Sequence, residues 1–444
     1  MHLRIYKAGR TLLSPGAWKT RIIFWSGAVA VGLLATGFAF TTEFANDSFR
    51  ALVQQWPYAP LIVCPAGLAL VAYLTQRFFP GAQGSGIPQA IAALNMPEHS
   101  ARKRILSMRI VLGKILLTLV GLFSGASIGR EGPTVHIGAS VMFFLGRFAK
   151  FPMHYMDRGL ILAGGAAGIA AAFNTPLAGI LFAIEELGRS YEARTSGTLL
   201  TAVFLAGITV VAIQGNYVYF GTSNATLILS DSLQPILVCG ILGGLLGGLF
   251  SQSIVWSTRR LAPFARQRPV FLATLCGTCI AVTGLLSGGL TFGTGYNEAE
   301  MIITGSGELP VYYTFLKMLA TLGSYLSGIP GGIFSPSLAT GAGLGAMISE
   351  FITAVPAGTL VILAMVGYFT GVVQTPITAL VIVMEMTDNT DLVLPLMATA
   401  FLAYITSRII CPYSIYRALA DSFLPQKNPG SKTDRSTGDS LKQT

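Results

Sequence analysis

The sequence predicts an all-α polytopic membrane protein made of two related halves, with many tilted and partly discontinuous helices. Of its 444 residues, 52% are hydrophobic and 11% are charged, and the mean hydropathy is +0.64. Soluble domains carry about 25% charged residues, so this composition excludes an ordinary soluble fold. The 51 glycines are typical of membrane helices that pack closely or break beside a cavity.

Basic residues near the two ends predict the topology. Residues 1–21 contain no acidic residue and five basic ones: Arg4, Lys7, Arg10, Lys19 and Arg21. The positive-inside rule therefore places this N-terminal segment in the cytoplasm, and we expect the polar tail over residues 421–444 there too. The net charge of +10 then reflects topology, and the expected partner is the lipid bilayer of a bacterial inner membrane rather than a nucleic acid.

Apolar segments follow one another from Ile22 to Ile410, separated by short loops. Two of them, residues 135–145 and 338–348, are shorter than the ~20 residues that cross a bilayer and follow turns rich in Gly and Pro. Half-length helices of this kind are typical of transporters with a discontinuous core. The glycines within residues 240–248 predict a face for close helix packing.

An internal repeat divides the chain. Three stretches recur in one order at offsets of 209, 203 and 200 residues: 84–90 with 293–299, 124–139 with 327–342, and 174–185 with 374–385. They predict a first membrane repeat over residues 22–213, a connection over 214–234 and a second membrane repeat over 235–420. Transporters built from such repeats bind their substrates where the repeats meet. The similarity alone leaves open whether the repeats are parallel or inverted.

Residues 124–139 place a carboxylate, Glu131, among glycines and small residues between apolar runs. An ionisable group at membrane depth costs roughly 2.5–3.5 kcal/mol, so a functional reason is expected. The following Gly132-Pro133 suits the start of a helix. Such a helix would direct free N–H groups at whatever lies beside Glu131. The stretch therefore indicates an anion site with a titratable acid as its lid.

With these motifs in hand, the sequence closely resembles the CLC family of chloride channels and chloride/proton antiporters. Four signatures carry the resemblance: Gly-Ser-Gly-Ile-Pro at 84–88, Gly-Arg-Glu-Gly-Pro at 129–133, Gly-Ile-Phe-Ser-Pro at 332–336, and Tyr416. The resemblance covers roughly residues 25–420 and implies a homodimer with one pore in each subunit, each subunit an inverted repeat. Only 28 residues follow Tyr416, so we expect the bacterial type without cytoplasmic regulatory domains.

The resemblance also implies the ligands of a chloride ion, the substrate, with no other cofactor and no metal. They are the hydroxyls of Ser85 and Tyr416 and the backbone N–H groups of Ile333 and Phe334. Neutral donors suit this task, because they bind an anion without trapping it. Tyr413, three residues before Tyr416, is a rival for the tyrosine position.

Two glutamates have roles that the resemblance implies. Glu131 acts as the gate: deprotonated, it competes with chloride for the same donors, and protonated, it swings away and carries a proton. The other reading of Glu131 is a buried partner for Arg130. Glu186 is the acid that collects cytoplasmic protons in exchangers, although the adjacent Glu185 is a second candidate. Two separated acids favour antiport over a passive channel.

Other readings remain open. The nearest is a CLC-type chloride channel, followed by a relative selective for fluoride or nitrate, against which Ser85 argues. The protein is not expected to be an enzyme, since an intramembrane protease using Ser85 or Ser335 needs a base beside the serine. Two further residues are notable. His136 follows the gate motif where many bacterial relatives have glutamine, and it is either a titrating group beside the pore or a satisfied hydrogen-bonding residue. Lys114 lies inside an apolar stretch and matches a family lysine, which implies a buried partner or an electrostatic tuner rather than a ligand.

Overall fold

The computed structural model describes residues 15–148, 158–188, 193–223, 225, 227 and 233–424. The basic residues Arg4, Lys7 and Arg10 and the tail from residue 425 onward lie outside the described residues, as do seven residues of the connection between the repeats.

Within the described ranges every regular element is helical. The first repeat contains α2 (Pro15–Gln55), α3 (Pro60–Phe78), α4 (Ile87–Asn95), α5 (His99–Ile105), α6 (Met108–Phe123), α7 (Glu131–Leu145), η1 (Gly146–Phe148), α9 (Arg158–Phe173), α10 (Pro176–Phe182), the π-helix η2 (Ala183–Gly188) and α11 (Ala193–Gln214). The second contains α12 (Leu233–Gln267), α13 (Pro269–Leu286), α14 (Tyr296–Ile303), α15 (Tyr313–Leu326), α16 (Phe334–Ser349), α17 (Ala357–Val373), α18 (Pro376–Thr387), α19 (Val393–Ile410), α20 (Ile415–Ala420) and η4 (Asp421–Phe423).

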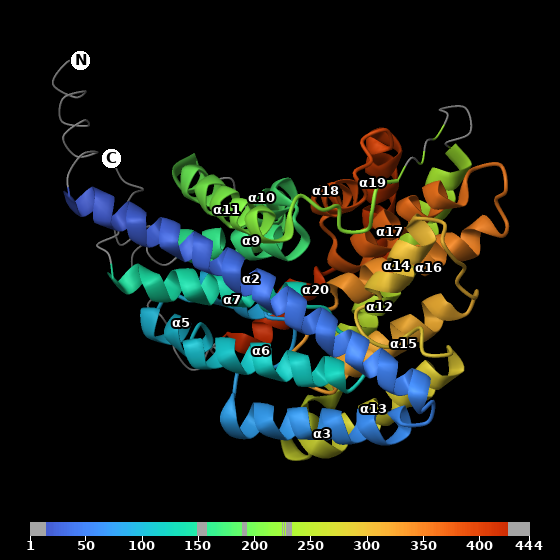
Figure 1. The fold of residues 1–444 in the computed structure, drawn as a ribbon, viewed down its shortest axis with the longest axis horizontal. Coiled ribbons are helices and arrows are strands. Elements are labelled where there is room, and N and C mark those ends of the chain that lie inside the picture. The colour runs from blue at the N-terminus through green and yellow to red at the C-terminus, as the bar shows by residue number, and fades with distance from the viewer. Residues whose placement is uncertain are drawn as a thin grey trace, which may run out of the picture.

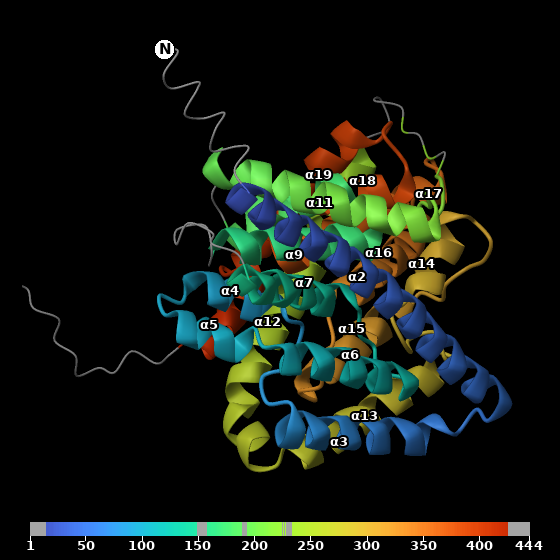
Figure 2. The ribbon, with the colours of Figure 1, turned by 60° about the vertical axis from the view of Figure 1, so that its left-hand side comes forward.

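The helices fall into a long group and a short group. In the described part of the chain, seven helices are long and apolar enough to cross a membrane. One of them is α2, which runs diagonally across the face of the molecule in Figure 1, with α6 and α7 beside it. The turned view of Figure 2 shows α11 along its other flank. The short group includes α7 and α16, of 15 and 16 residues. The predicted half-length helices are therefore confirmed, each beginning four residues before its apolar segment.

The short helices form the core, and glycines let them approach. Every residue of α17 from Thr359 onward is buried. A methyl group on Gly243 or Gly247 of α12 would meet the backbone of α17 around Gly367 and Gly371. Only glycine permits this approach, so the predicted packing role of residues 240–248 is confirmed.

The two repeats meet through reciprocal contacts. Gly129 and Gly332, which differ by the repeat offset of 203, donate N–H bonds to each other's carbonyls at 2.7 and 2.8 Å. Because this bridge is antiparallel, the loops that lead into α7 and α16 run in opposite directions. The repeats are therefore inverted, and the N-termini of α7 and α16 approach each other at the centre of the molecule.

A second reciprocal pair caps two helices. Glu185 accepts N–H bonds from Ile377 and Thr378 at the start of α18, at 3.3 and 2.7 Å. Its counterpart Glu385 accepts from Leu177 and Ala178 at the start of α10, at 3.2 and 2.8 Å. Each carboxylate satisfies free amides at the N-terminus of the other repeat's helix. The pair therefore clamps the two repeats together.

Candidate anion site between the repeats

Glycine loops bring the N-termini of α4, α7 and α16 together at the centre of the molecule. Gly84 and Gly86 have φ angles of +69° and +104°, in the left-handed region that favours glycine, and Gly86 is the N-cap of α4. The loop is fixed by bonds from the Gly84 N–H to Ile329 and from the Gly331 N–H to the Gly84 carbonyl, at 3.0 and 3.2 Å. Ser85 is therefore held against the loop that leads into α16.

Ser85 and Tyr416 present buried hydroxyls to this place. Their side chains are 1% and 0% exposed, and neither hydroxyl has a hydrogen-bond partner among the described residues. Ser85 lies against Gly132, where a side chain would collide with its Oγ. The Tyr416 ring lies 6.5 Å from the Phe334 ring and is nearly parallel to it. Unpaired buried hydroxyls cost about 1–3 kcal/mol each, which marks them as candidates to bind a ligand.

The N-terminus of α16 supplies backbone donors. Ile333 is its N-cap and Phe334 its first residue, so their N–H groups are among those that have no partner within the helix. The structure thus brings together Ser85, Ile333, Phe334 and Tyr416. Tyr413 is elsewhere: its side chain is 62% exposed, which excludes the rival from this site.

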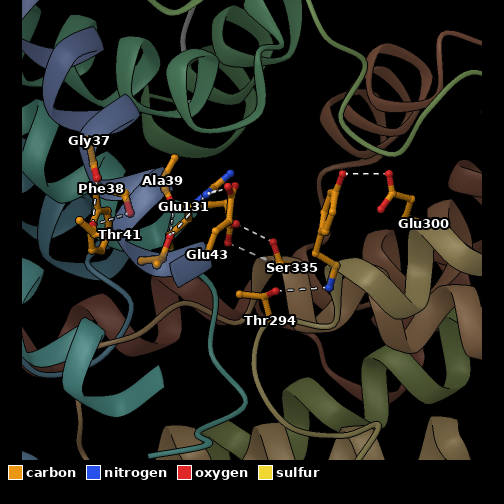
Figure 3. A network of polar contacts seen from close by, with 12 residues as sticks. Gly37, Phe38, Ala39, Thr41, Glu43, Glu131, Thr294, Glu300 and Ser335 are labelled. Carbon is orange, nitrogen blue, oxygen red and sulfur yellow. Dashed lines mark hydrogen bonds and ion pairs between the residues drawn. The ribbon is translucent and has the colours of Figure 1, made fainter. Parts of the chain in front are cut away.

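Glu131 lies in front of α16. It is fully buried, and its Oε1 accepts a bond from the Ser335 hydroxyl at 2.5 Å while Oε2 accepts from the Ser335 N–H at 3.4 Å. Figure 3 shows this carboxylate reaching toward Ser335 from the opposite repeat. A carboxylate therefore occupies the positive end of the α16 dipole, where an anion is stabilised.

Arg130 points the other way. Its Nη1 lies 2.8 Å from Glu43 Oε1, and its guanidinium carbon lies 5.9 Å from the centre of the Tyr219 ring. Arg130 and Tyr219 line a polar cavity of about 190 Å³ together with residues of α2 and the start of α14. We call it the Arg130 cavity. The neighbour of Glu131 is thus bound to Glu43, which argues against an Arg130–Glu131 pair as the reason for the buried acid.

A larger cavity reaches Ser85 from the other end of the molecule. It has a volume of about 620 Å³ and is lined by Ser85, Gln89, Tyr325 and the C-terminal ends of α3 and α12. We call it the Ser85 cavity. The turn between α2 and α3 is four residues long, so the two helices run antiparallel and their C-terminal ends lie on opposite sides of the molecule. The Arg130 cavity lies at the C-terminal part of α2, and the Ser85 cavity lies at the C-terminal end of α3. Glu131 is buried between the two cavities.

Glu186 lies in the π-helix η2, a distortion that is frequent at functional sites. It is fully buried, and its Oε1 accepts a bond from the Ser414 hydroxyl at 3.0 Å. Ser414 is the N-cap of α20 and precedes Tyr416 by two residues. Glu186 is therefore bound to the segment that carries Tyr416, whereas Glu185 caps α18. The structure separates the two adjacent acids by their partners.

Two buried lysines support the glycine loops. Lys114 donates to the Gly84 carbonyl at 2.9 Å. Its counterpart Lys317, which the sequence reading did not single out, donates to the Thr291 and Gly293 carbonyls at 3.0 and 2.9 Å. His136 Nε2 lies 2.8 Å from the Ile105 carbonyl and so donates to it. These groups hold backbone near the site rather than facing it.

Three further residues contribute to the site without having been assigned to it from the sequence. The Ser335 hydroxyl binds Glu131, Tyr219 lies beside Ser335 and Arg130, and Glu43 binds Arg130. The only available signal was for Ser335, which stands inside the Gly-Ile-Phe-Ser-Pro signature. Among the described residues, no cluster of His, Cys, Asp or Glu has the size of a metal site.

The family model described as voltage gated chloride channel matches residues 67–408. The chain belongs to the CLC family. Among its relatives, the H(+)/Cl(-) exchange transporter ClcA of Citrobacter koseri is 30% identical, covering 90% of this chain and 89% of the relative. The ClcA of Salmonella typhimurium is also 30% identical, covering 96% and 95%.

Solved CLC structures share the fold. A slow cyanobacterial Cl−/H+ antiporter superposes with a TM-score of 0.78 at 24% identity, over 92% of this chain and 98% of that chain. A CLC-type fluoride/proton antiporter gives a TM-score of 0.77 at 23% identity, over 90% and 96%. The predicted family and the predicted inverted-repeat helical membrane fold are confirmed.

Proposed function

We propose that this protein is a chloride/proton antiporter in which Glu131 and chloride compete for the donors at the N-terminus of α16. The observation that carries the proposal is the bond between the Glu131 carboxylate and Ser335. A negatively charged side chain there lies beside Ser85, Phe334 and Tyr416, the donors expected for chloride. The curated relatives of the same family are named for H(+)/Cl(-) exchange.

Protonation provides the coupling step. The ionised Glu131 accepts bonds from Ser335 and is attracted to the positive end of α16. When one proton binds the carboxylate, its charge and most of that attraction are lost. Chloride can then occupy the α16 donors with the hydroxyls of Ser85 and Tyr416. Loss of the proton to the Arg130 cavity restores the carboxylate, which displaces the anion.

Glu186 supplies protons from the opposite side. Its carboxyl and that of Glu131 both lie close enough to Tyr416 to act on it electrostatically. Ser414 ties Glu186 to the N-terminus of α20. A proton can therefore pass from Glu186 toward Glu131 past Tyr416 while chloride enters through the Ser85 cavity. Antiport requires a proton route that is partly separate from the chloride route, whereas a passive chloride channel needs no proton route.

Charge distribution supports cytoplasmic termini. Basic residues gather at one set of helix ends: Lys19, Arg21, Arg77, Arg104, Arg147, Arg259, Arg260, Arg268 and Arg408. Acidic residues gather at the opposite ends: Glu43, Asp47, Glu300, Glu308, Asp388 and Asp391. The positive-inside rule assigns the basic end to the cytoplasm of a bacterial inner membrane. We propose a homodimer with one such path in each subunit.

A flux assay tests the antiport. Purified protein in liposomes is given an outward chloride gradient at equal pH, and proton movement is followed with a pH electrode. Antiport predicts protons moving into the liposomes as chloride leaves, and continuing against a small opposing pH gradient. Chloride efflux without proton uptake would establish the channel. Replacing chloride with fluoride or nitrate tests the other anions, since the shared fold does not distinguish them.

A further inference from the structure

A basic cavity lies at the cytoplasmic end of α12, apart from the anion path. Its volume is about 400 Å³, and its lining consists of Gln252, Val255, Trp256, Arg259, Arg260, Pro412 and Tyr413. We call it the Trp256 pocket. Arg259 and Arg260 are exposed and, among the described residues, form no hydrogen bond or ion pair. Their charges are available to a ligand.

The pocket continues into an apolar surface between α12 and α19. The two helices are in close contact, with Gly244 and Gly248 against the backbone of Ala403 and Ser407. Beside this contact, both helices expose large apolar side chains: Leu245, Leu249, Ile405 and Ile409. The pocket, which could hold a charged headgroup, is thus next to an apolar surface that could contact an acyl chain.

Trp256 and Tyr413 mark the level of the membrane surface. Each is 62% exposed, and such amphipathic rings concentrate where hydrocarbon meets the headgroups. Basic pockets between transmembrane helices on the cytoplasmic side are suited to anionic lipid headgroups. We propose that the Trp256 pocket binds an anionic phospholipid of the cytoplasmic leaflet, with its phosphate at Arg259 and Arg260 and an acyl chain along α12 and α19.

The occupant would touch the segment that leads to the anion site. Pro412 and Tyr413 connect α19 to Ser414, which binds Glu186, and then to Tyr416. The Cys411 carbonyl accepts a bond from Gln374 at 2.5 Å, so this connection is anchored on its α19 side. A lipid in the pocket would therefore hold the remaining residues of the connection.

Quenching of Trp256 fluorescence by brominated lipid tests the site. Trp18, Trp25 and Trp56, the other tryptophans, are replaced by Phe, and the variant is reconstituted in mixtures of brominated phosphatidylglycerol or brominated phosphatidylcholine. We expect on the order of tenfold preference for phosphatidylglycerol near Trp256, given the contribution of each nearby basic residue. The Arg259→Gln/Arg260→Gln variant should lose this preference.

The matched control is Arg104→Gln/Arg268→Gln, which removes the same charge at the same membrane face outside the pocket and should keep the preference. Equal quenching by both lipids, or equal loss in both double variants, would overturn the proposal. Displacement of the lipid by millimolar inorganic phosphate would show a simple anion site instead. If the single-tryptophan variant does not fold, retention of phosphatidylglycerol over phosphatidylcholine by the unaltered chain in native mass spectrometry, lost in Arg259→Gln/Arg260→Gln, decides the question.

Discussion

The two repeats share a scaffold but not a chemistry. At corresponding positions, Lys114 and Lys317 both donate to carbonyls of glycine loops. Gly129 and Gly332 bind each other. Asn174 and Gln374 share φ angles of +56° and +58°. Features present in both repeats therefore build the fold and fix its symmetry.

Three candidate functional residues of the first repeat, Ser85, Glu131 and Glu186, have different residues at the corresponding positions of the second repeat. Glu131 corresponds to Phe334 at the offset of 203, and Glu186 corresponds to Met386 at the offset of 200. Ser85 corresponds to Thr294, whose Oγ1 accepts a bond from the Tyr296 N–H at 3.3 Å, whereas the Ser85 hydroxyl has no partner among the described residues. The comparison teaches that asymmetric side chains on a symmetric backbone create the site.

The largest difference is expected between the adjacent acids. Glu186→Gln should abolish proton transport and leave chloride movement, because the neutral amide cannot carry a proton. Glu185→Gln, the matched control, should keep proton coupling but lose about 1 kcal/mol of stability, since a charged cap of α18 is replaced. Liposome fluxes and thermal unfolding in detergent measure both. Coupling that survives in the first variant and fails in the second would reverse the assignment.

Ser85 and Thr294 offer the next contrast. Ser85→Ala should weaken chloride binding about tenfold, the worth of one hydrogen bond to a charged group. Thr294→Ala should leave chloride affinity unchanged, because its hydroxyl serves its own loop. Isothermal titration of the purified protein with chloride measures this difference. Equal effects at both positions would mean that the two loops are functionally equivalent.

The sequence predicted the scaffold well. Turns rich in glycine and proline marked where the short helices begin, and the repeat offset of 203 relates Gly129 to Gly332, which the structure shows in contact. Apolar composition fixed the membrane class because the bilayer tolerates so few charges. The Gly132-Pro133 pair predicted the start of α7 to within one residue, whereas the apolar run alone begins four residues later, because the first turn also holds the polar residues Glu131 and Thr134.

Contacts between distant residues could not be predicted in the same way. The Ser335–Glu131 bond joins residues 204 positions apart, and the Arg130–Glu43 pair joins residues 87 apart. Neither has a local signature, since each depends on how the repeats meet. The choice between Glu185 and Glu186 likewise rested on sequence register until the structure gave them different partners.

The smallest effect is expected at Ser335. Ser335→Ala removes the hydroxyl donor to Glu131 but keeps the backbone N–H. The carboxylate then competes less well with chloride, so chloride turnover at neutral pH should rise about two- to fivefold, within the range of one hydrogen bond. Ser349→Ala at the far end of α16 is the control and should not change turnover. A fall in turnover at Ser335 would show that its hydroxyl serves chloride instead.

The competition between Glu131 and chloride is tested most directly by measuring chloride and proton fluxes together in Glu131→Ala liposomes, with Glu308→Ala as an exposed control. The account predicts that proton movement stops while chloride continues down its gradient, because the donors of α16 remain but the proton carrier is gone. Glu308→Ala should behave as the unaltered protein. Sustained uphill proton movement in Glu131→Ala would contradict the account.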